Sequence, residues 1–261
     1  MNYAYVTVLS TNNYYDGVLV LYESLKRTNP KYNKFVVLIN DEIDAHIIAE
    51  LSKRNIIIRK MPKIEPSNLV NNKTYTHWNY TFDKLNIFEL TEFDKIVYLD
   101  SDMYIANNID ELFDLPHMSG VISGKGYVKK WVELGSGLMV IVPEKGTVDG
   151  MKKILNEYDF GKDVGDQDII NKYFDWPNKN LAISEKYNLF ACFSDYYVKE
   201  LGYKRDEISV IHFIGSKKPW MYTEEEIKAY RDHLIKSDNV NELYFFDKYI
   251  KLLKEIKNNY N

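Results

Sequence analysis

The sequence has few of the features that stabilise small secreted domains or anchor proteins in membranes. Its one cysteine, Cys192, cannot form an intramolecular disulfide or a cysteine-based zinc site, and we expect it simply to pack. No apolar run approaches the roughly 18 residues of a membrane span. Positive charge is not in excess, because 34 Lys and Arg residues face 38 Asp and Glu residues and leave a formal net charge of −4. The composition therefore argues against a disulfide scaffold, a transmembrane protein and a general nucleic-acid binder.

Familiar phosphate-binding and hydrolase motifs are also missing. No Gly-x-x-x-x-Gly-Lys-[Ser/Thr] loop occurs, no Gly-x-Gly-x-x-Gly follows the first apolar segment, and Gly-x-Ser-x-Gly is absent. Any phosphate would therefore be bound by a metal ion and lysine rather than by a glycine-rich helix start. The N-terminus lacks the basic and apolar regions of a signal peptide, so we expect a soluble cytoplasmic protein. The Asn, Lys, Ile and Tyr content suggests an AT-rich genome, which fits many bacteria and large viruses. For a viral source the expected location is the host cytoplasm.

What the sequence does contain is an alternation of strands and helices. Its 261 residues and 45% hydrophobic content suit one large domain. The alternation predicts an α/β fold with a largely parallel sheet, helices on both faces, and ligands bound beyond the carboxyl ends of the strands. Residues 60–80 carry no clear periodicity and are expected to form a long surface loop. Strands are expected over residues 3–9, 35–39, 56–58, 95–99, 120–123, 137–142 and 208–214, and helices over residues 18–25, 43–51, 82–90, 166–174 and 241–256.

The tail over residues 241–256 has apolar residues at helical spacing. One interpretation is a terminal helix that docks on its own core or on a second subunit, so that a homodimer stays open. The other is a helix on a membrane surface, with four lysines toward lipid phosphates. These lysines are Lys248, Lys251, Lys254 and Lys257.

Two carboxylates stand where an apolar strand ends. Asp100 and Asp102 follow the segment over residues 95–99, and their spacing lets both side chains converge on one cation once the chain turns. Hard divalent ions prefer such oxygen ligands and keep positions for a substrate phosphate. The alternative is an ordinary turn, in which aspartate and serine are common residues.

A histidine lies near the end of another apolar strand. His212 is followed by Gly215, which would let the backbone approach a pyrophosphate, and by Lys218, which offers a point charge. An imidazole beside two carboxylates would favour manganese over magnesium. The alternative for His212 is a hydrogen-bonded core histidine without a metal.

Five blocks of the sequence together resemble the motif blocks of the glycogenin-like retaining glycosyltransferases of family 8. The resemblance extends over roughly residues 3–222, and galactinol synthases and plant glucuronosyl- or xylosyl-transferring relatives share the blocks. An Asp-x-Asp at a strand end combined with a distant His-Phe-x-Gly-x-x-Lys-Pro-Trp is specific, although each motif alone is not. The blocks are residues 7–28, 82–116, 135–143, 165–171 and 210–222.

The resemblance implies a fold and an activity. The fold is GT-A, with a Rossmann-like sheet in a single domain over residues 1–222 and a C-terminal helical extension over residues 223–261 packed on that domain. The implied enzyme moves a hexose, glucose in the first place, from a UDP-sugar to a hydroxyl of a glycan or protein acceptor with retention. The implied metal is Mn²⁺, with Mg²⁺ as the alternative.

The resemblance also implies roles for individual residues. The metal ligands would be Asp100, Asp102 and His212, and the uridine pocket would be lined by Leu9, Thr11, Asn12 and Tyr15. The remaining nucleotide-sugar contacts would come from Lys84, Ser101, Ser136, Gly215 and Lys218. The catalytic set would be Asp163, Asp166, Gln167 and Lys218.

The chemistry of sugar transfer is consistent with this set. Loss of UDP leaves negative charge on the diphosphate, which a divalent ion and Lys218 would stabilise, and positive charge on the sugar, which Asp163 and Asp166 would face. Asp166 as a covalent nucleophile and attack by the acceptor from the leaving-group face both retain configuration, and both stay open. The structural alternative for Asp166 is a helix N-cap.

The sequence departs from the family pattern at two places. Gly135, Ser136 and Gly137 stand where the family often has Asn-Ser-Gly, which leaves the donor sugar less defined. No tyrosine falls at the spacing of the self-glucosylated tyrosine of glycogenin, so self-glucosylation rests only on nearby Tyr196 and Tyr197. The alternatives to a transferase are a non-catalytic UDP-sugar-binding module and a HAD-like phosphohydrolase.

Overall fold

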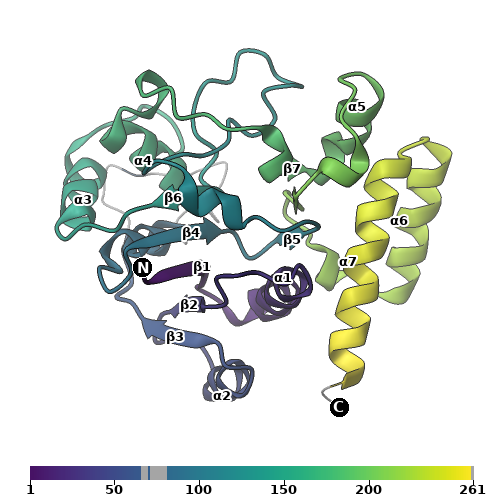
Figure 1. Cartoon of the computed structure of the whole chain (residues 1–261), viewed down its shortest axis with the longest axis horizontal. Helices are drawn as coiled ribbons and strands as arrows, with labels where there is room; N and C mark the ends of the chain where they lie inside the picture. Colours follow the sequence, from purple (N-terminus) through teal and green to yellow (C-terminus); the bar gives the residue numbers. More distant parts are fainter. Residues whose placement is uncertain (66–69, 71–80, 260–261) are drawn as a thin grey trace.

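The computed structural model of the chain describes residues 1–65, 70 and 81–259. Figure 1 shows a central sheet with helices above and below it, and a pair of long helices, α6 and α7, along one side. The loop expected over residues 60–80 lies for the most part outside the described residues.

The central sheet has five strands in the order β3-β2-β1-β4-β6. All neighbouring pairs are parallel except β4 with β6, which is antiparallel. The prediction of a largely parallel sheet is therefore confirmed. The strands are β1 (Tyr3–Leu9), β2 (Phe35–Ile39), β3 (Ile57–Lys60), β4 (Lys95–Leu99) and β6 (Leu138–Ile141).

Both faces of this sheet are covered. Successive residues of a strand point to opposite faces, and so Tyr5 packs in one hydrophobic cluster and Val6 in the other. Helices α1 and α2 contribute to the first cluster, and α3 and α4 to the second (Figure 1). Burial on two sides explains why these strands read as continuous apolar runs. The helices are α1 (Tyr15–Arg27), α2 (Ala45–Lys53), α3 (Thr147–Glu157) and α4 (Asp166–Phe174), with the 3₁₀ helix η3 (Phe82–Glu89) beside α3 and α4.

A second, three-stranded sheet was not anticipated from the sequence. It has the order β5-β8-β7, and β5 follows β4 after a reversal over residues 100–102. The strand expected over residues 208–214 is shorter than predicted, and residues 120–123 make only isolated bridges at Gly120 because the chain turns at Gly124, whose φ is 78°. The strands are β5 (Met103–Ile105), β7 (Leu189–Phe190) and β8 (Val210–His212).

The C-terminal segment is helical and lies against α1. Phe245, Phe246 and Tyr249 of α7 are buried in the cluster that α1 also enters, and Arg27 pairs with Glu255 at 2.6 Å. Among the described residues, no helix has both the length and the apolarity that crossing a membrane requires. The helices here are α5 (Ser194–Lys199), α6 (Glu224–Lys236) and α7 (Val240–Asn259).

Short 3₁₀ helices complete the described structure, and one of them corrects a prediction. Cys192, expected to pack, is exposed in η7, because the buried positions of that turn are taken by its neighbours Ala191 and Ser194. The 3₁₀ helices are η1 (Asn12–Tyr14), η4 (Asp110–Asp114), η5 (Trp176–Asn178), η6 (Glu185–Tyr187), η7 (Ala191–Phe193), η8 (Arg205–Glu207) and η9 (Pro219–Met221).

Candidate active site

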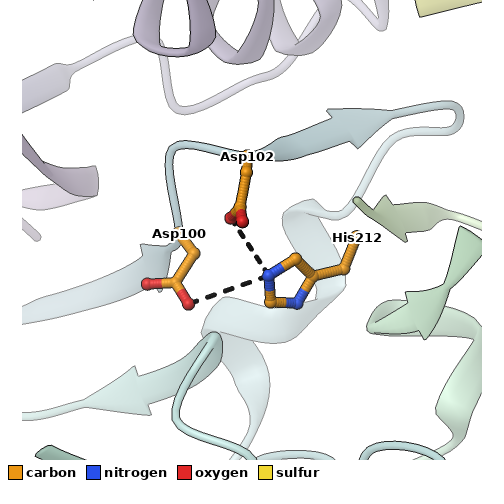
Figure 2. Close-up of side chains that lie close together, drawn as sticks. All are labelled: Asp100, Asp102 and His212. Carbon is orange, nitrogen blue, oxygen red and sulfur yellow. Dashed lines mark ion pairs between the residues drawn. The ribbon is translucent and has the colours of Figure 1, made fainter. Parts of the chain in front are cut away.

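The two carboxylates at the end of β4 and the histidine of β8 lie together. The reversal after β4 leads into β5, and antiparallel pairing places Met103 opposite His212, next to Asp102. Nε2 of His212 lies 3.0 Å from Oδ1 of Asp102 and 3.9 Å from Oδ2 of Asp100 (Figure 2). One ligand atom from each of the three residues lies within 4.8 Å of the others. Strand pairing thus brings together side chains that are about a hundred positions apart in the sequence.

The orientation of the imidazole is set by Asn188, a residue that the sequence analysis missed. Oδ1 of Asn188 lies 3.0 Å from Nδ1 of His212, and Nδ2 of Asn188 donates to Oγ of Ser123 at 2.7 Å. Since the amide oxygen can only accept, a neutral His212 carries its proton on Nδ1 and leaves the Nε2 lone pair toward the carboxylates. Asparagine is a common turn residue, so no signal in the sequence distinguishes this position.

These three residues fit a divalent metal ion. Two carboxylate oxygens and one imidazole nitrogen are a mixed donor set that suits Mn²⁺ or a similar transition ion, and the hydrogen bond from His212 to Asn188 is the outer support that metal-bound histidines usually have. Gly137 leaves the room they need, because a β-carbon there would lie 2.9 Å from Cε1 of His212 and 3.1 Å from Oδ2 of Asp100.

A buried lysine completes this cluster on the side of Asp102. Nζ of Lys218 donates to Oδ2 of Asp102 at 2.6 Å and to the backbone oxygen of Phe213 at 3.1 Å. Burial alone would raise the pKa of Asp102, but the positive charges of a protonated His212 and of Lys218 hold that pKa well below its usual range. Asp102 is therefore an ionised ligand at neutral pH. Gly215, three residues before Lys218, is exposed and has a φ of 103°, a conformation that favours glycine.

A second buried lysine joins Asp100 to Asp166. Nζ of Lys84 lies 3.0 Å from Oδ1 of Asp100 and 2.7 Å from Oδ2 of Asp166, and Oγ of Ser136 donates to the same Oδ2 at 2.6 Å. Burial works to lower the pKa of Lys84, but the two carboxylates outweigh it and raise that pKa. Asp166 is the first residue of α4, with Gly165 as its N-cap, so the structural alternative of an aspartate N-cap is wrong.

Two adjoining cavities border these residues. The first, of about 270 Å³, extends from the end of β1 to the residues over 100–102 and is lined by Thr11 and Tyr14 among others. The second, of about 680 Å³, is lined by Asp163, Asp166 and Gln167. Thr81, Lys84 and Asp100 line both cavities, so the two are contiguous.

Three of the residues that the resemblance assigned to a uridine pocket do not line the first cavity. The side chain of Leu9 is fully buried in the core, because the alternation of β1 turns Val8 and not Leu9 toward the first cavity. Asn12 and Tyr15 line a different cavity beside Asp44, whose backbone N–H donates to Oδ1 of Asn12 at 3.1 Å. Tyr14, one position earlier than expected, lines the first cavity instead. Thr11, the fourth residue of that assignment, lines the first cavity, as do Ser101 and Lys84, which were expected to make other nucleotide-sugar contacts.

The fold is that of a GT-A glycosyltransferase. A solved galactosyltransferase, LgtC, in complex with donor and acceptor sugar analogues, superposes with a TM-score of 0.64 over 97% of this chain and 95% of its own, at 16% identity. The family model described as glycosyl transferase family 8 matches residues 5–129 and 136–224. The chain therefore belongs to glycosyltransferase family 8. The phosphohydrolase alternative from the sequence analysis is excluded by this membership.

Relatives in sequence support the same assignment and differ in length. Protein R707 of Acanthamoeba polyphaga mimivirus is 32% identical over 96% of this chain and 90% of its own length. A glycogenin of Neurospora crassa is 31% identical over 83% of this chain, which spans only 31% of that glycogenin. The resemblance to glycogenin-like enzymes is confirmed, and the chain spans about a third of this longer relative.

Proposed function

We propose that the chain transfers a hexose, with glucose as the first candidate, from a UDP-sugar to a hydroxyl acceptor with retention of configuration. The observation that carries this proposal is the contiguity of the two cavities across Lys84 and Asp100. A nucleotide in the first cavity would direct its diphosphate toward Asp100 and Asp102, and the sugar would then occupy the second cavity beside Asp166. Cleavage of the bond between a sugar and a nucleoside diphosphate requires this arrangement, with the diphosphate and the sugar held in adjoining parts of one site.

Asp100, Asp102 and His212 would hold the metal ion, which we propose to be Mn²⁺ because of the nitrogen ligand. When bound, a divalent ion neutralises negative charge on the diphosphate as it leaves. Lys218 adds a fixed positive charge on the same side, and its pKa is raised by Asp102 in spite of burial, so it stays protonated at neutral pH. The leaving group would thus meet cationic charge that is already in place.

The opposite charge develops on the sugar, and carboxylates face the cavity proposed for it. Asp163 and Asp166 line this cavity together with Gln167, and Asp166 is held in place by Lys84 and Ser136. A carboxylate fixed by two partners would stabilise an oxocarbenium-like sugar without reorganising during the reaction. Gln167 accepts a hydrogen bond from the backbone N–H of Ser136 at 3.3 Å, and this contact would hold Gln167 beside the sugar.

The tyrosines that suggested self-glucosylation are poorly placed to accept a sugar. Tyr197 is 1% exposed, and its hydroxyl donates to Glu185 and accepts from the backbone N–H of Gly126. Tyr196 packs edge-on against Tyr127. We therefore propose an external acceptor. Incubation with UDP-glucose and Mn²⁺ followed by mass spectrometry tests this point, because a hexose on either tyrosine would overturn it.

Variants of the metal ligands test the assignment directly. Asp102→Ala and His212→Ala should weaken Mn²⁺-dependent UDP binding by at least about tenfold in calorimetry, because each removes one of three ligands. His46→Ala, an exposed histidine paired weakly with Asp44, serves as the matched control and should bind like the parent. Unchanged titration curves for Asp102→Ala and His212→Ala would contradict the metal site.

A screen of UDP-sugars with Mn²⁺ then tests turnover. Release of UDP with one donor in preference to the others would identify the sugar, and UDP binding without any release would favour the non-catalytic binding module. Asp166→Asn is the variant to compare, because it keeps the shape of the side chain and removes the charge proposed to face the sugar. We expect it to bind UDP like the parent and to lose most of the release.

A further inference from the structure

A third cavity continues the row formed by the first two. It has a volume of about 480 Å³ and shares Glu133 and Gln167 with the cavity proposed for the donor sugar. The three cavities thus run from the nucleotide end past Asp166 to Trp131. A group in the third cavity would approach the donor sugar from the side of Gln167.

The lining of this cavity combines an aromatic face with polar groups. Trp131 is 39% exposed, and its ring lies close to the backbone of Gly124, where a β-carbon would be 2.5 Å from Cζ3. Phe190 forms another part of the lining, and its ring is 5.6 Å from that of His212. Lys130 and Glu133 supply a donor and an acceptor at the edge.

Such a lining matches the surface of a sugar ring. A pyranose has an apolar face of C–H groups, which packs on an aromatic ring, and an edge of hydroxyls, which needs hydrogen-bond partners. The exposed indole provides the first, and Lys130, Glu133 and Gln167 provide the second.

The segment that carries Trp131 lies outside the residues that the family model matches. The family model matches up to residue 129 and resumes at residue 136, so residues 130–135 fall between the matched segments. The end of this segment is nevertheless fixed: the backbone N–H of Leu134 donates to Oδ1 of Asn171 at 2.9 Å, and that of Gly135 to the oxygen of Val121 at 2.8 Å. Residues 130–135 thus combine side chains outside the matched segments with a fixed backbone beside the proposed donor site. Such residues are well placed to select the acceptor.

We propose that the third cavity binds the terminal sugar of a saccharide acceptor, with Trp131 stacking on the sugar ring and setting acceptor specificity. This inference rests on the proposed function, since it takes the second cavity as the site of the donor sugar. It narrows the acceptor from any hydroxyl compound to a glycan. The hydroxyl that attacks would belong to the sugar held between Trp131 and Gln167.

Saccharide binding to the protein loaded with UDP and Mg²⁺ tests this proposal by saturation-transfer NMR. The probes are maltotriose, cellotriose and xylotriose, and we expect at least one to bind with saturation concentrated on its terminal ring. Trp131→Ala should raise the dissociation constant of that probe about tenfold or more, whereas Trp131→Phe should keep it within about threefold of the parent. Tyr158→Ala, which removes another exposed aromatic ring outside the three cavities, should leave it unchanged.

Each result decides the question. Absence of saturation transfer to all three probes, or equal binding by the parent and Trp131→Ala, would overturn the proposal. Calorimetry of UDP binding on the same samples separates failure of the acceptor site from failure of the proposed function. Loss of saccharide binding with intact UDP binding refutes the acceptor site alone. Failure to bind UDP in the parent would instead refute the proposed function.

Discussion

Asn188→Leu is the most informative single change at the proposed metal site, because it leaves the three proposed ligands unchanged. Leucine has a similar size, but it removes both the acceptor for Nδ1 of His212 and the donor to Oγ of Ser123. The imidazole then loses the partner that keeps its proton off Nε2, and the other tautomer blocks the lone pair that would bind the ion. Comparable changes at outer hydrogen-bond partners cost 10- to 100-fold in metal affinity, which corresponds to about 1.4–2.7 kcal/mol.

The assay for Asn188→Leu is a calorimetric titration of Mn²⁺ in the presence of UDP, with thermal unfolding as the second readout. Two buried polar groups lose their partner, so the free energy of unfolding should also fall, by about 1–3 kcal/mol per group. Asn241→Leu is the control: Asn241 is also buried at the start of α7, and its side-chain amide donates to Asp195 of α5. It should lose stability and keep its Mn²⁺ affinity. Parental Mn²⁺ affinity in Asn188→Leu would refute the orienting role of Asn188.

Two further predictions concern packing and pH. Gly137→Ala should keep the fold and lower the affinity for UDP in the presence of Mn²⁺ several-fold, since its β-carbon would lie too close to His212. Equal affinity in the variant and the parent would show that His212 can move without loss of binding. Burial works against ionisation of Asp195, but the backbone N–H groups of Asn241 and Glu242 lower its pKa. Its stabilising effect is thus complete above about pH 4, the usual aspartate pKa, and is lost as pH falls through the lowered pKa. Urea unfolding should show a smaller loss between pH 5 and about pH 3 in Asp195→Asn than in the parent.

Most of the central sheet could be predicted from the sequence, because its strands are buried on both faces. Burial of this kind leaves continuous apolar runs, as over residues 35–39 and 95–99, and these were placed correctly. The small second sheet gave no such signal. Strands β5 and β7 have three and two residues, too short for a period to appear, and their pairing with β8 depends on contacts between distant segments.

The cluster of Asp100, Asp102 and His212 was predictable for a different reason, which does not apply to the first cavity beside it. Charged and imidazole side chains at strand ends are conspicuous against apolar runs, and so Asp100, Asp102 and His212 were found. The lining of the first cavity depends instead on which way each residue of β1 and the following turn faces, and a shift of one position moves a side chain to the other face. For this reason Val8 and Tyr14 line the first cavity, and their neighbours Leu9 and Tyr15 do not.

The balance of charge in the site explains why buried carboxylates are tolerated there. The ion-paired cluster contains three carboxylates, Asp100, Asp102 and Asp166, and two lysines, Lys84 and Lys218, which leaves one formal negative charge if His212 is neutral. A divalent cation alone would change this total by two, and so would a diphosphate with two negative charges. When the cation and the diphosphate bind together, the net charge of the cluster is unchanged. Each partner thus offsets the charge that makes burial of the other costly. This charge balance therefore favours joint binding of the ion and the nucleotide over binding of either alone. Sugar transfer would then begin from a cluster with the same net charge as before either partner binds.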